Sequence, residues 1–180
     1  MRPPPPVSPA GAPLADFGSR LLAVLIDGAI LTGVGMVVII PVFYFVLTWM
    51  TRSMHSINSP SGTRPDPYAV ISGVLLPLIL LELGFVVFML ILYYVYYVEM
   101  LYNSGQTIGK KALKIRVVPL DPAATLTRGM AAKRYAIEFV VGTFVPFFRY
   151  LDGLWQLWDK PYLQTLHDKV AKTVVIKVSP

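Results

Sequence analysis

Two long apolar stretches with almost no charge limit what this chain can fold into. Residues 21–49 carry one formal charge, Asp27, and residues 69–101 are interrupted only by Glu82 and Glu99. About 20 apolar residues suffice for a helix to cross the hydrocarbon core of a bilayer, so each stretch is long enough. Only 14% of the chain is charged, whereas soluble domains carry about 25%. The sequence therefore predicts an all-α membrane protein with two full transmembrane helices.

A third apolar region, residues 135–158, predicts a kinked or re-entrant helix. It contains Pro146, Arg149, Asp152 and Gly153, and a proline inside a helix breaks or kinks it. A helix that enters the membrane and returns near Pro146 keeps the C-terminal lysines on the side of the preceding basic loop. A single full crossing would move them to the opposite side. We favour the re-entrant form and keep the full crossing as the alternative.

The distribution of basic residues predicts the orientation. The segment from 102 to 134 has seven basic residues against one acidic residue, and the loop from 50 to 68 has two basic residues against one acidic residue. Basic loops stay on the cytoplasmic side, so we expect the first segment and the N-terminus in the cytoplasm. The net charge of +6 then serves topology and anionic lipid headgroups rather than nucleic acid.

The N-terminal segment differs in composition from the rest of the chain. Residues 1–13 contain six prolines, and such segments form extended, solvated chain rather than a packed core. We therefore expect two parts: a disordered proline-rich tail over residues 1–16 and one membrane domain over residues 17–180.

Two short runs rich in β-branched residues predict a small β ribbon. They lie at residues 114–118 and 173–178, and Val, Ile and Thr are enriched in strands. Each run is too short to be stable alone. Paired on one side of the membrane, the two runs would form a two-stranded cytoplasmic ribbon.

The first apolar stretch begins with two charged residues on one helix face. Arg20 and Asp27 are seven residues apart, which separates them by about 10 Å along a helix axis. Arg20 is long enough to reach the headgroups, but Asp27 lies inside the hydrocarbon, where a carboxylate is protonated, paired or facing water. Two interpretations stay open: Asp27 handles protons or cations, or it fixes the helix bundle.

A second intramembrane carboxyl group could take part in the same chemistry. Glu82 lies near the middle of the second stretch. If it faces Asp27, the two carboxyl groups share a proton, because neighbouring carboxylates raise one pKa. Otherwise Glu82 is a neutral side chain bonded to a neighbouring helix.

Two further pairs of charges have helical spacing. Arg134 and Glu138 are four residues apart, and Arg149 and Asp152 are three apart, so each pair can neutralise locally. We expect the first pair on the surface and the second beside the break, where it closes the bundle. Asp152 is therefore a third candidate for ion or proton handling.

Several chemistries are excluded by the residues available. The chain has no cysteine, and His55 and His167 have no partner at a ligand spacing, so no metal site and no cofactor are expected. Residues 105–111 resemble a phosphate-binding loop, but three residues rather than four separate the glycines. We expect an interfacial turn there. No nucleophile–base pair is visible, so we expect no catalytic residue and no enzyme.

Three motifs resemble the RDD family of bacterial integral membrane proteins, which is named for one arginine and two aspartates. They are FGSRLLAVLID at residues 17–27, GQTIGKK at 105–111 with IRVV at 115–118, and QTLHDKVAKTVV at 164–175. The resemblance implies that Arg20 and Asp27 are the arginine and first aspartate. It places the second aspartate at Asp168, with Asp152 as runner-up. Lys172 departs from the family, where glycine is common.

The resemblance also frames the expected function. The family looks like small proteins of the bacterial plasma membrane proposed to act in transport, and some members resemble monovalent cation/proton antiporters. One hypothesis is a homo-oligomer that moves small cations or protons through Asp27, with Glu82. The alternative is a non-catalytic accessory or assembly subunit of a larger membrane complex. The bilayer and its anionic headgroups are the other expected partners.

Overall fold

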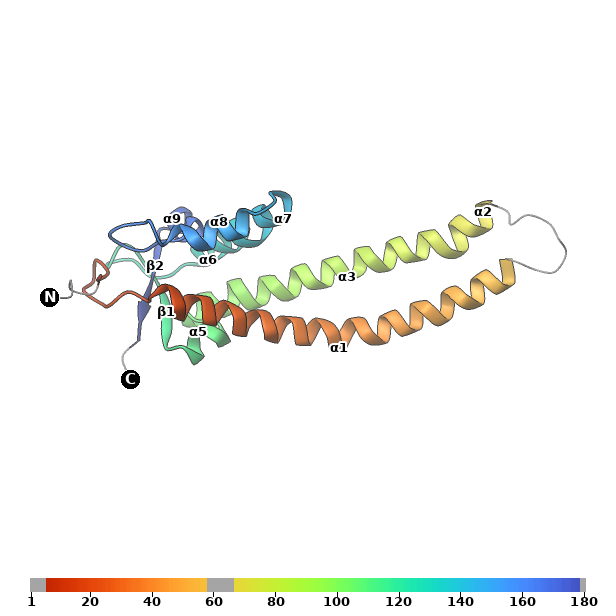
Figure 1. The fold of residues 1–180 in the computed structure, drawn as a ribbon, viewed down its shortest axis with the longest axis horizontal. Helices are drawn as coiled ribbons and strands as arrows, with labels where there is room; N and C mark the ends of the chain where they lie inside the picture. Colours follow the sequence, from red (N-terminus) through yellow and green to blue (C-terminus); the bar gives the residue numbers. More distant parts are fainter. Residues whose placement is uncertain (1–5, 58–66, 179–180) are drawn as a thin grey trace. The chain divides into compact units, whose positions relative to one another are not determined.

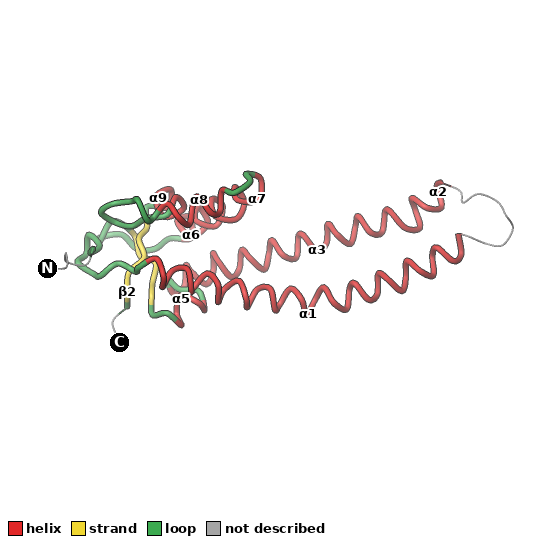
Figure 2. Tube along the Cα trace, in the orientation of Figure 1, coloured by secondary structure: helices red, strands yellow, loops and turns green. Residues whose placement is uncertain are grey.

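The computed structural model describes residues 6–57 and 67–178, and these residues are mostly helical (Figure 2). The chain divides into two compact units. One unit comprises Met1–Ala29 and Tyr93–Pro180, and the other comprises Ile30–Leu92. Helix α1 (Phe17–Ile57) contributes its first residues to the former unit and the remainder to the latter.

The unit formed by Ile30–Leu92 is built from two apolar helical segments. The second part of α1 supplies one, and the other consists of α2 (Pro67–Val70), the π-helical segment η1 (Ile71–Leu75) and α3 (Leu76–Tyr94). Inside this unit Met89 approaches Gly35, so the two segments pack on each other. The predicted loop at 50–68 is shorter than expected, because α1 continues to Ile57. Residues 58–66 of that loop lie outside the described residues.

Two helical runs are long and apolar enough to cross a membrane, namely Phe17–His55 and Ile71–Ser104. Only 11% and 6% of their most apolar windows are buried inside the protein. A core helix of a soluble protein buries its apolar side chains in the protein, whereas these helices direct them outward, as lipid-facing helices do. The two predicted apolar helices are therefore confirmed as elements.

The other unit contains all the remaining helices and both strands of the described chain. In chain order after α3, the elements are η2 (Val95–Glu99), α4 (Met100–Ser104), α5 (Ile108–Ala112), β1 (Ile115–Pro119), α6 (Arg128–Tyr135), η3 (Ala136–Val141), α7 (Gly142–Phe144), α8 (Phe148–Trp155), α9 (Leu166–Ala171) and β2 (Thr173–Lys177). Its core brings together residues from α1, η2, α4, α6 and both strands.

The predicted two-stranded ribbon is confirmed as an element, and its cytoplasmic location stays a prediction. Strands β1 and β2 pair antiparallel, with Ile115 opposite Lys177 and Val118 opposite Val174 (Figure 1). Val117 and Val175 face each other and are buried, so the apolar side chains of the ribbon stabilise it by packing on the helices.

Residues 6–16 differ from the predicted disordered tail. Leu14 bridges to Ile176, and the Ala15 amide donates to the Val175 carbonyl at 2.9 Å. Leu14 and Ala15 are buried. This part of the segment is ordered because it covers the free edge of β2, and an uncovered edge leaves backbone groups unpaired. Residues 1–5 of the predicted tail lie outside the described residues.

The third apolar region is interrupted at the predicted place. The helical run from α6 through α7 ends at Phe144, and α8 begins at Phe148 after Pro146. Phe147 has a left-handed backbone with φ of 62°. Helix α8 then contacts η3 and α9, so the region folds back on itself (Figure 1). Its position relative to a membrane stays a prediction.

Candidate functional site

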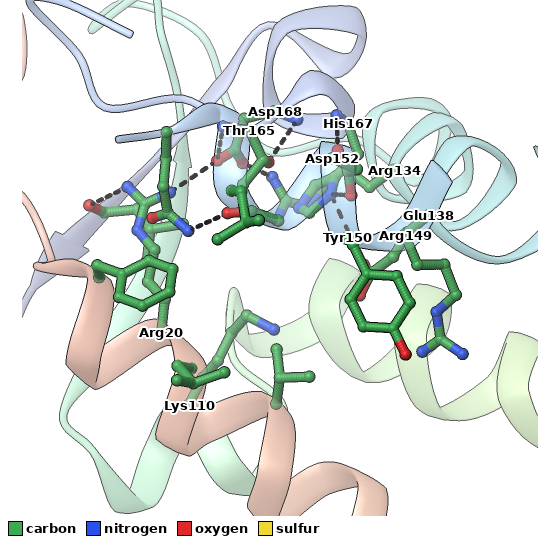
Figure 3. A pocket seen from close by; sticks show the side chains of 17 residues that line it. Arg20, Lys110, Arg134, Glu138, Arg149, Tyr150, Asp152, Thr165, His167 and Asp168 are labelled. Carbon is green, nitrogen blue, oxygen red and sulfur yellow. Dashed lines mark hydrogen bonds and ion pairs between the residues drawn. The ribbon is translucent and has the colours of Figure 1, made fainter. Parts of the chain in front are cut away.

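Asp168 is fully buried between two arginines that come from distant parts of the sequence. Arg20 Nη1 donates to Asp168 Oδ2 at 2.9 Å, and Arg134 Nη1 donates to Oδ1. The same nitrogen of Arg134 donates to Thr173 Oγ1 at 2.6 Å. One carboxylate therefore ties α1, α6 and α9 together (Figure 3).

The sequence around Asp168 orients its carboxylate locally. Thr165 Oγ1 accepts from the Asp168 amide, and Asp168 Oδ2 accepts from the Thr165 amide, both at 3.2 Å. This reciprocal arrangement is a capping box at the start of α9. Burial raises the pKa of Asp168, but the charges of Arg134 and Arg20 lower it by more than burial raises it. The pKa of Asp168 therefore lies well below the usual carboxyl range.

Two expectations about the arginines are wrong. Arg20 does not reach out toward headgroups: it is 7% exposed and paired with Asp168. Arg134 does not form a surface pair with Glu138, because it too is buried and bonded to Asp168. The Thr-x-x-Asp pattern at 165–168 is a helix-start signal that could have indicated a positioned carboxylate. It would still not have revealed the partners, which lie 148 and 34 residues away.

Asp27 is also fully buried, and three donors face its carboxyl group. Tyr96 Oη donates to Oδ1 at 2.5 Å, Thr107 Oγ1 to Oδ2 at 2.6 Å and the Gly109 amide to Oδ1 at 2.7 Å. These donors come from η2, from the N-cap of α5 and from α5 itself. The carboxyl group therefore holds the turn at 105–111 against α1.

The turn at 105–111 packs closely against α1, and its expected place at the membrane interface stays a prediction. Gly109 lies so close to α1 that a Cβ atom there would stand 2.2 Å from the Ala23 carbonyl oxygen. Gly105 has positive φ, 70°, and ends α4, a conformation that favours glycine. Lys110 lines a cavity of the same unit, and only Lys111 is exposed as expected for a headgroup contact.

Asp152 bonds to His167 rather than to Arg149. Its Oδ1 accepts from the His167 amide at 2.8 Å, and its Oδ2 lies 2.6 Å from His167 Nδ1. Glu138 Oε2 lies 3.9 Å from the same nitrogen. Arg149 instead places its guanidinium 5.1 Å from the centre of the Phe139 ring. The predicted Arg149–Asp152 pair is therefore wrong, because the break turns α8 toward α9.

Glu82 takes part in none of the hydrogen bonds and ion pairs described above for the other carboxyl groups. Its side chain is exposed on α3, and the partners of Asp27 are Tyr96, Thr107 and Gly109. A proton shared by Glu82 and Asp27 stays a prediction. Within residues 6–57 and 67–178, no group of three His, Asp or Glu side chains is placed to hold a metal ion.

A cavity of about 420 Å³ opens beside this network. Arg20, Arg134, Asp168 and His167 line one side, while Lys110, Arg149 and Tyr150 line other parts (Figure 3). Burial lowers the pKa of Lys110, and the nearby Glu138 partly opposes this effect. Asp27 does not line the cavity. The two aspartates therefore have different surroundings. Asp27 holds η2 and α5 against α1, whereas Asp168 lines the cavity.

The lowered pKa of Asp168 predicts acid sensitivity. A carboxyl group whose pKa is lower in the folded state stabilises that state above its unfolded pKa, and the contribution is lost as pH falls. The melting temperature in detergent, followed by tryptophan fluorescence, should therefore decline as pH falls below about 4. Asp121→Asn removes a carboxylate that accepts only from the exposed Ala123 amide, and should leave this decline unchanged. A flat profile down to pH 3 would contradict the prediction.

Comparison with known proteins supplies one match. A family model described as RDD family matches residues 14–172, which includes Arg20, Asp27 and Asp168. This match confirms the resemblance seen in the motifs. Neither the curated proteins nor the solved structures contain a match to this chain.

Proposed function

The chain belongs to the RDD family, and from that premise we propose that it is a non-catalytic accessory protein of the bacterial plasma membrane. In this proposal Phe17–His55 and Ile71–Ser104 cross the bilayer, and the basic unit that contains the ribbon faces the cytoplasm. The outward apolar side chains of both helices support the crossings. The basic residues between 102 and 134 support the orientation, by the positive-inside rule.

The observation that carries the proposal is the environment of Asp27. Its carboxyl group is 0% exposed, accepts from three protein donors and is absent from the lining of the cavity. A group that passes ions or protons needs access to water on at least one side. The contacts of Asp27 instead match a structural role, in which it locks α5 and η2 onto α1.

The third apolar region has a compatible place in this arrangement. Because α8 returns along η3, its two ends can lie on one side of the membrane. This keeps Lys160, Lys169, Lys172 and Lys177 in the cytoplasm, together with the ribbon. The region then forms a hairpin at the membrane surface instead of a third crossing.

Transport of small cations or protons is the second candidate, and one observation favours it. Asp152, His167 and Glu138 form a chain of titratable groups, with His167 Nδ1 2.6 Å from Asp152 and 3.9 Å from Glu138. All three line the open cavity. Two spans in one chain are too few to enclose a path, so this candidate requires a homo-oligomer.

Asp27→Asn separates the two candidates. The accessory function predicts that the purified protein, reconstituted into liposomes with a trapped pH dye, shows no cation-dependent proton flux above protein-free liposomes. It also predicts that Asp27→Asn lowers stability by about 1–3 kcal/mol, because an amide nitrogen replaces an acceptor among three donors. Tryptophan fluorescence in detergent measures this loss.

The matched control is Asp121→Asn, which alters an exposed turn and should change stability by less than about 0.5 kcal/mol. Flux in the wild type that Asp27→Asn abolishes at unchanged melting temperature would establish transport through Asp27 and overturn the accessory function. If His167→Gln loses the flux while Asp27→Asn retains it, transport would be assigned to the chain of Asp152, His167 and Glu138.

A further inference from the structure

Polar and apolar side chains both line the cavity of about 420 Å³, and the two sets are called its polar wall and its apolar wall. The polar wall holds the side chains that join α1, α6 and α9. The apolar wall comes from the first turns of α1, through Phe17, Leu21 and Val24, and from Leu154 of α8. A volume of this size is typical of sites for small molecules. The two walls together favour a ligand with a polar head and an apolar body.

The polar wall has more cationic groups than carboxylates. Four basic side chains and three carboxylates line the cavity. Arg20 and Arg134 share a single carboxylate, Asp168. For Lys110 and Arg149, the described residues provide no carboxylate within 4.0 Å. The head of a matching ligand is therefore an anion.

Two buried polar atoms beside the cavity also lack partners in the described structure. Arg20 Nε and Gln156 Oε1 have no hydrogen-bond partner there, although both side chains are at least nine-tenths buried and line the cavity. Lys110 Nζ has only a long contact, 3.5 Å, to Thr107 Oγ1. A buried donor without an acceptor is unfavourable. A bound oxyanion would supply acceptors to the nitrogen donors.

The apolar wall continues onto exposed surface. Leu21 is 45% exposed and Val24 is 41% exposed, and both lie in the run proposed to enter the bilayer. On α8 and the turn before it, Phe147 and Tyr150 are also exposed. Aromatic side chains of this kind gather at membrane interfaces. The cavity is therefore continuous with a surface that suits acyl chains.

We propose that this cavity binds the phosphate group of an anionic phospholipid, with Lys110 and Arg149 contacting the phosphate and Leu21 and Val24 lining the lipid's apolar part. A phosphate group could come from a lipid headgroup or from free inorganic phosphate. The apolar wall of the cavity favours the lipid. The inference rests on the membrane location in the proposed function, and it adds a ligand class to that function.

The test is direct binding to the full-length protein in detergent. Dihexanoyl phosphatidylglycerol, titrated by calorimetry, should bind saturably, and inorganic phosphate should bind at least about tenfold more weakly because it lacks the apolar contacts. Dihexanoyl phosphatidylcholine has the same acyl chains but a zwitterionic headgroup with no net charge. It should also bind at least about tenfold more weakly than dihexanoyl phosphatidylglycerol.

Variants of neighbouring lysines provide the matched comparison. Lys110→Gln should weaken binding of phosphatidylglycerol by about tenfold or more, whereas Lys111→Gln on the exposed side of α5 should leave it within about twofold. Arg149→Gln, at an exposed position, should weaken binding without unfolding the protein. Melting temperatures checked alongside show that each variant is folded.

Three results would overturn the inference. Equal affinity for the two lipids would show that the charge of the headgroup does not matter. Equal loss of affinity in Lys110→Gln and Lys111→Gln would show that the cavity is not the binding site. If inorganic phosphate binds as tightly as the lipid, the ligand is free phosphate and the cavity is not a lipid-specific site. Ion flux in the liposome assay counts against the proposed accessory function alone, so the two failures are distinguishable.

Discussion

Replacing Asp168 with asparagine is expected to destabilise the protein by about 3–5 kcal/mol, the range seen when one partner of a buried ion pair is removed. Arg20 and Arg134 both donate to this carboxylate, and both are buried. Asparagine has nearly the same shape but no charge, so two guanidinium groups would share one neutral acceptor. The loss is a large share of a typical stability of about 5–15 kcal/mol.

The measurement is thermal or denaturant unfolding in detergent, followed by tryptophan fluorescence. Asp168→Asn should unfold at much lower temperature than wild type, and Asp121→Asn should match wild type because its carboxylate lies in an exposed turn. A folded Asp168→Asn protein with an unchanged melting temperature would show that the two arginines do not depend on this carboxylate.

Replacing Gly109 with alanine is expected to have the second largest effect, about 3 kcal/mol or more, from overpacking and a weakened hydrogen bond. The added Cβ would stand 2.2 Å from the Ala23 carbonyl oxygen and 2.8 Å from Asp27 Oδ1. Both are fixed parts of α1, so α5 has to move away. That movement lengthens the bond from the Gly109 amide to Asp27, which is 2.7 Å in the intact protein.

Gly129→Ala is the matched control for this substitution. In α6 the nearest atom to a new Cβ would be Thr127 Oγ1 at 3.7 Å, an ordinary contact. Alanine is also the better helix former by about 1 kcal/mol, so Gly129→Ala should be neutral or slightly stabilising. Equal melting temperatures for the two variants would contradict the close approach of α5 to α1.

Parts of this fold follow from local sequence because they depend on local physics. The apolar stretches predict two long helices because a helix satisfies its own backbone groups and needs no partner to do so. The interruption at Pro146 follows from the missing amide of proline. The ribbon of 115–119 and 173–177 was recognisable because two β-branched runs required a pairing partner.

The candidate site was predictable only in part. Arg20 and Asp27 stand out as charges at the start of an apolar stretch, whereas Asp168 is indicated only by the resemblance to a family. The length of its side chain assigned Arg20 to headgroups, and helical spacing assigned Arg134 to a surface pair with Glu138. Both assignments are wrong because a buried carboxylate attracts cations from any element that reaches it, whatever their distance in sequence. Charge spacing within a helix describes only neighbours on that helix.

The sequence by itself determined that an arginine and an aspartate lie seven residues apart at the start of a long apolar helix, and that lipid would not tolerate both unpaired. Only the tertiary structure decided their partners. Arg20 pairs with Asp168, whereas Asp27 accepts hydrogen bonds from Tyr96, Thr107 and Gly109. Arg20 and Asp27 therefore have separate partners. The reason is desolvation: each buried polar or charged side chain requires hydrogen-bonding partners, and folding supplies those partners from chain segments 69 to 148 residues away.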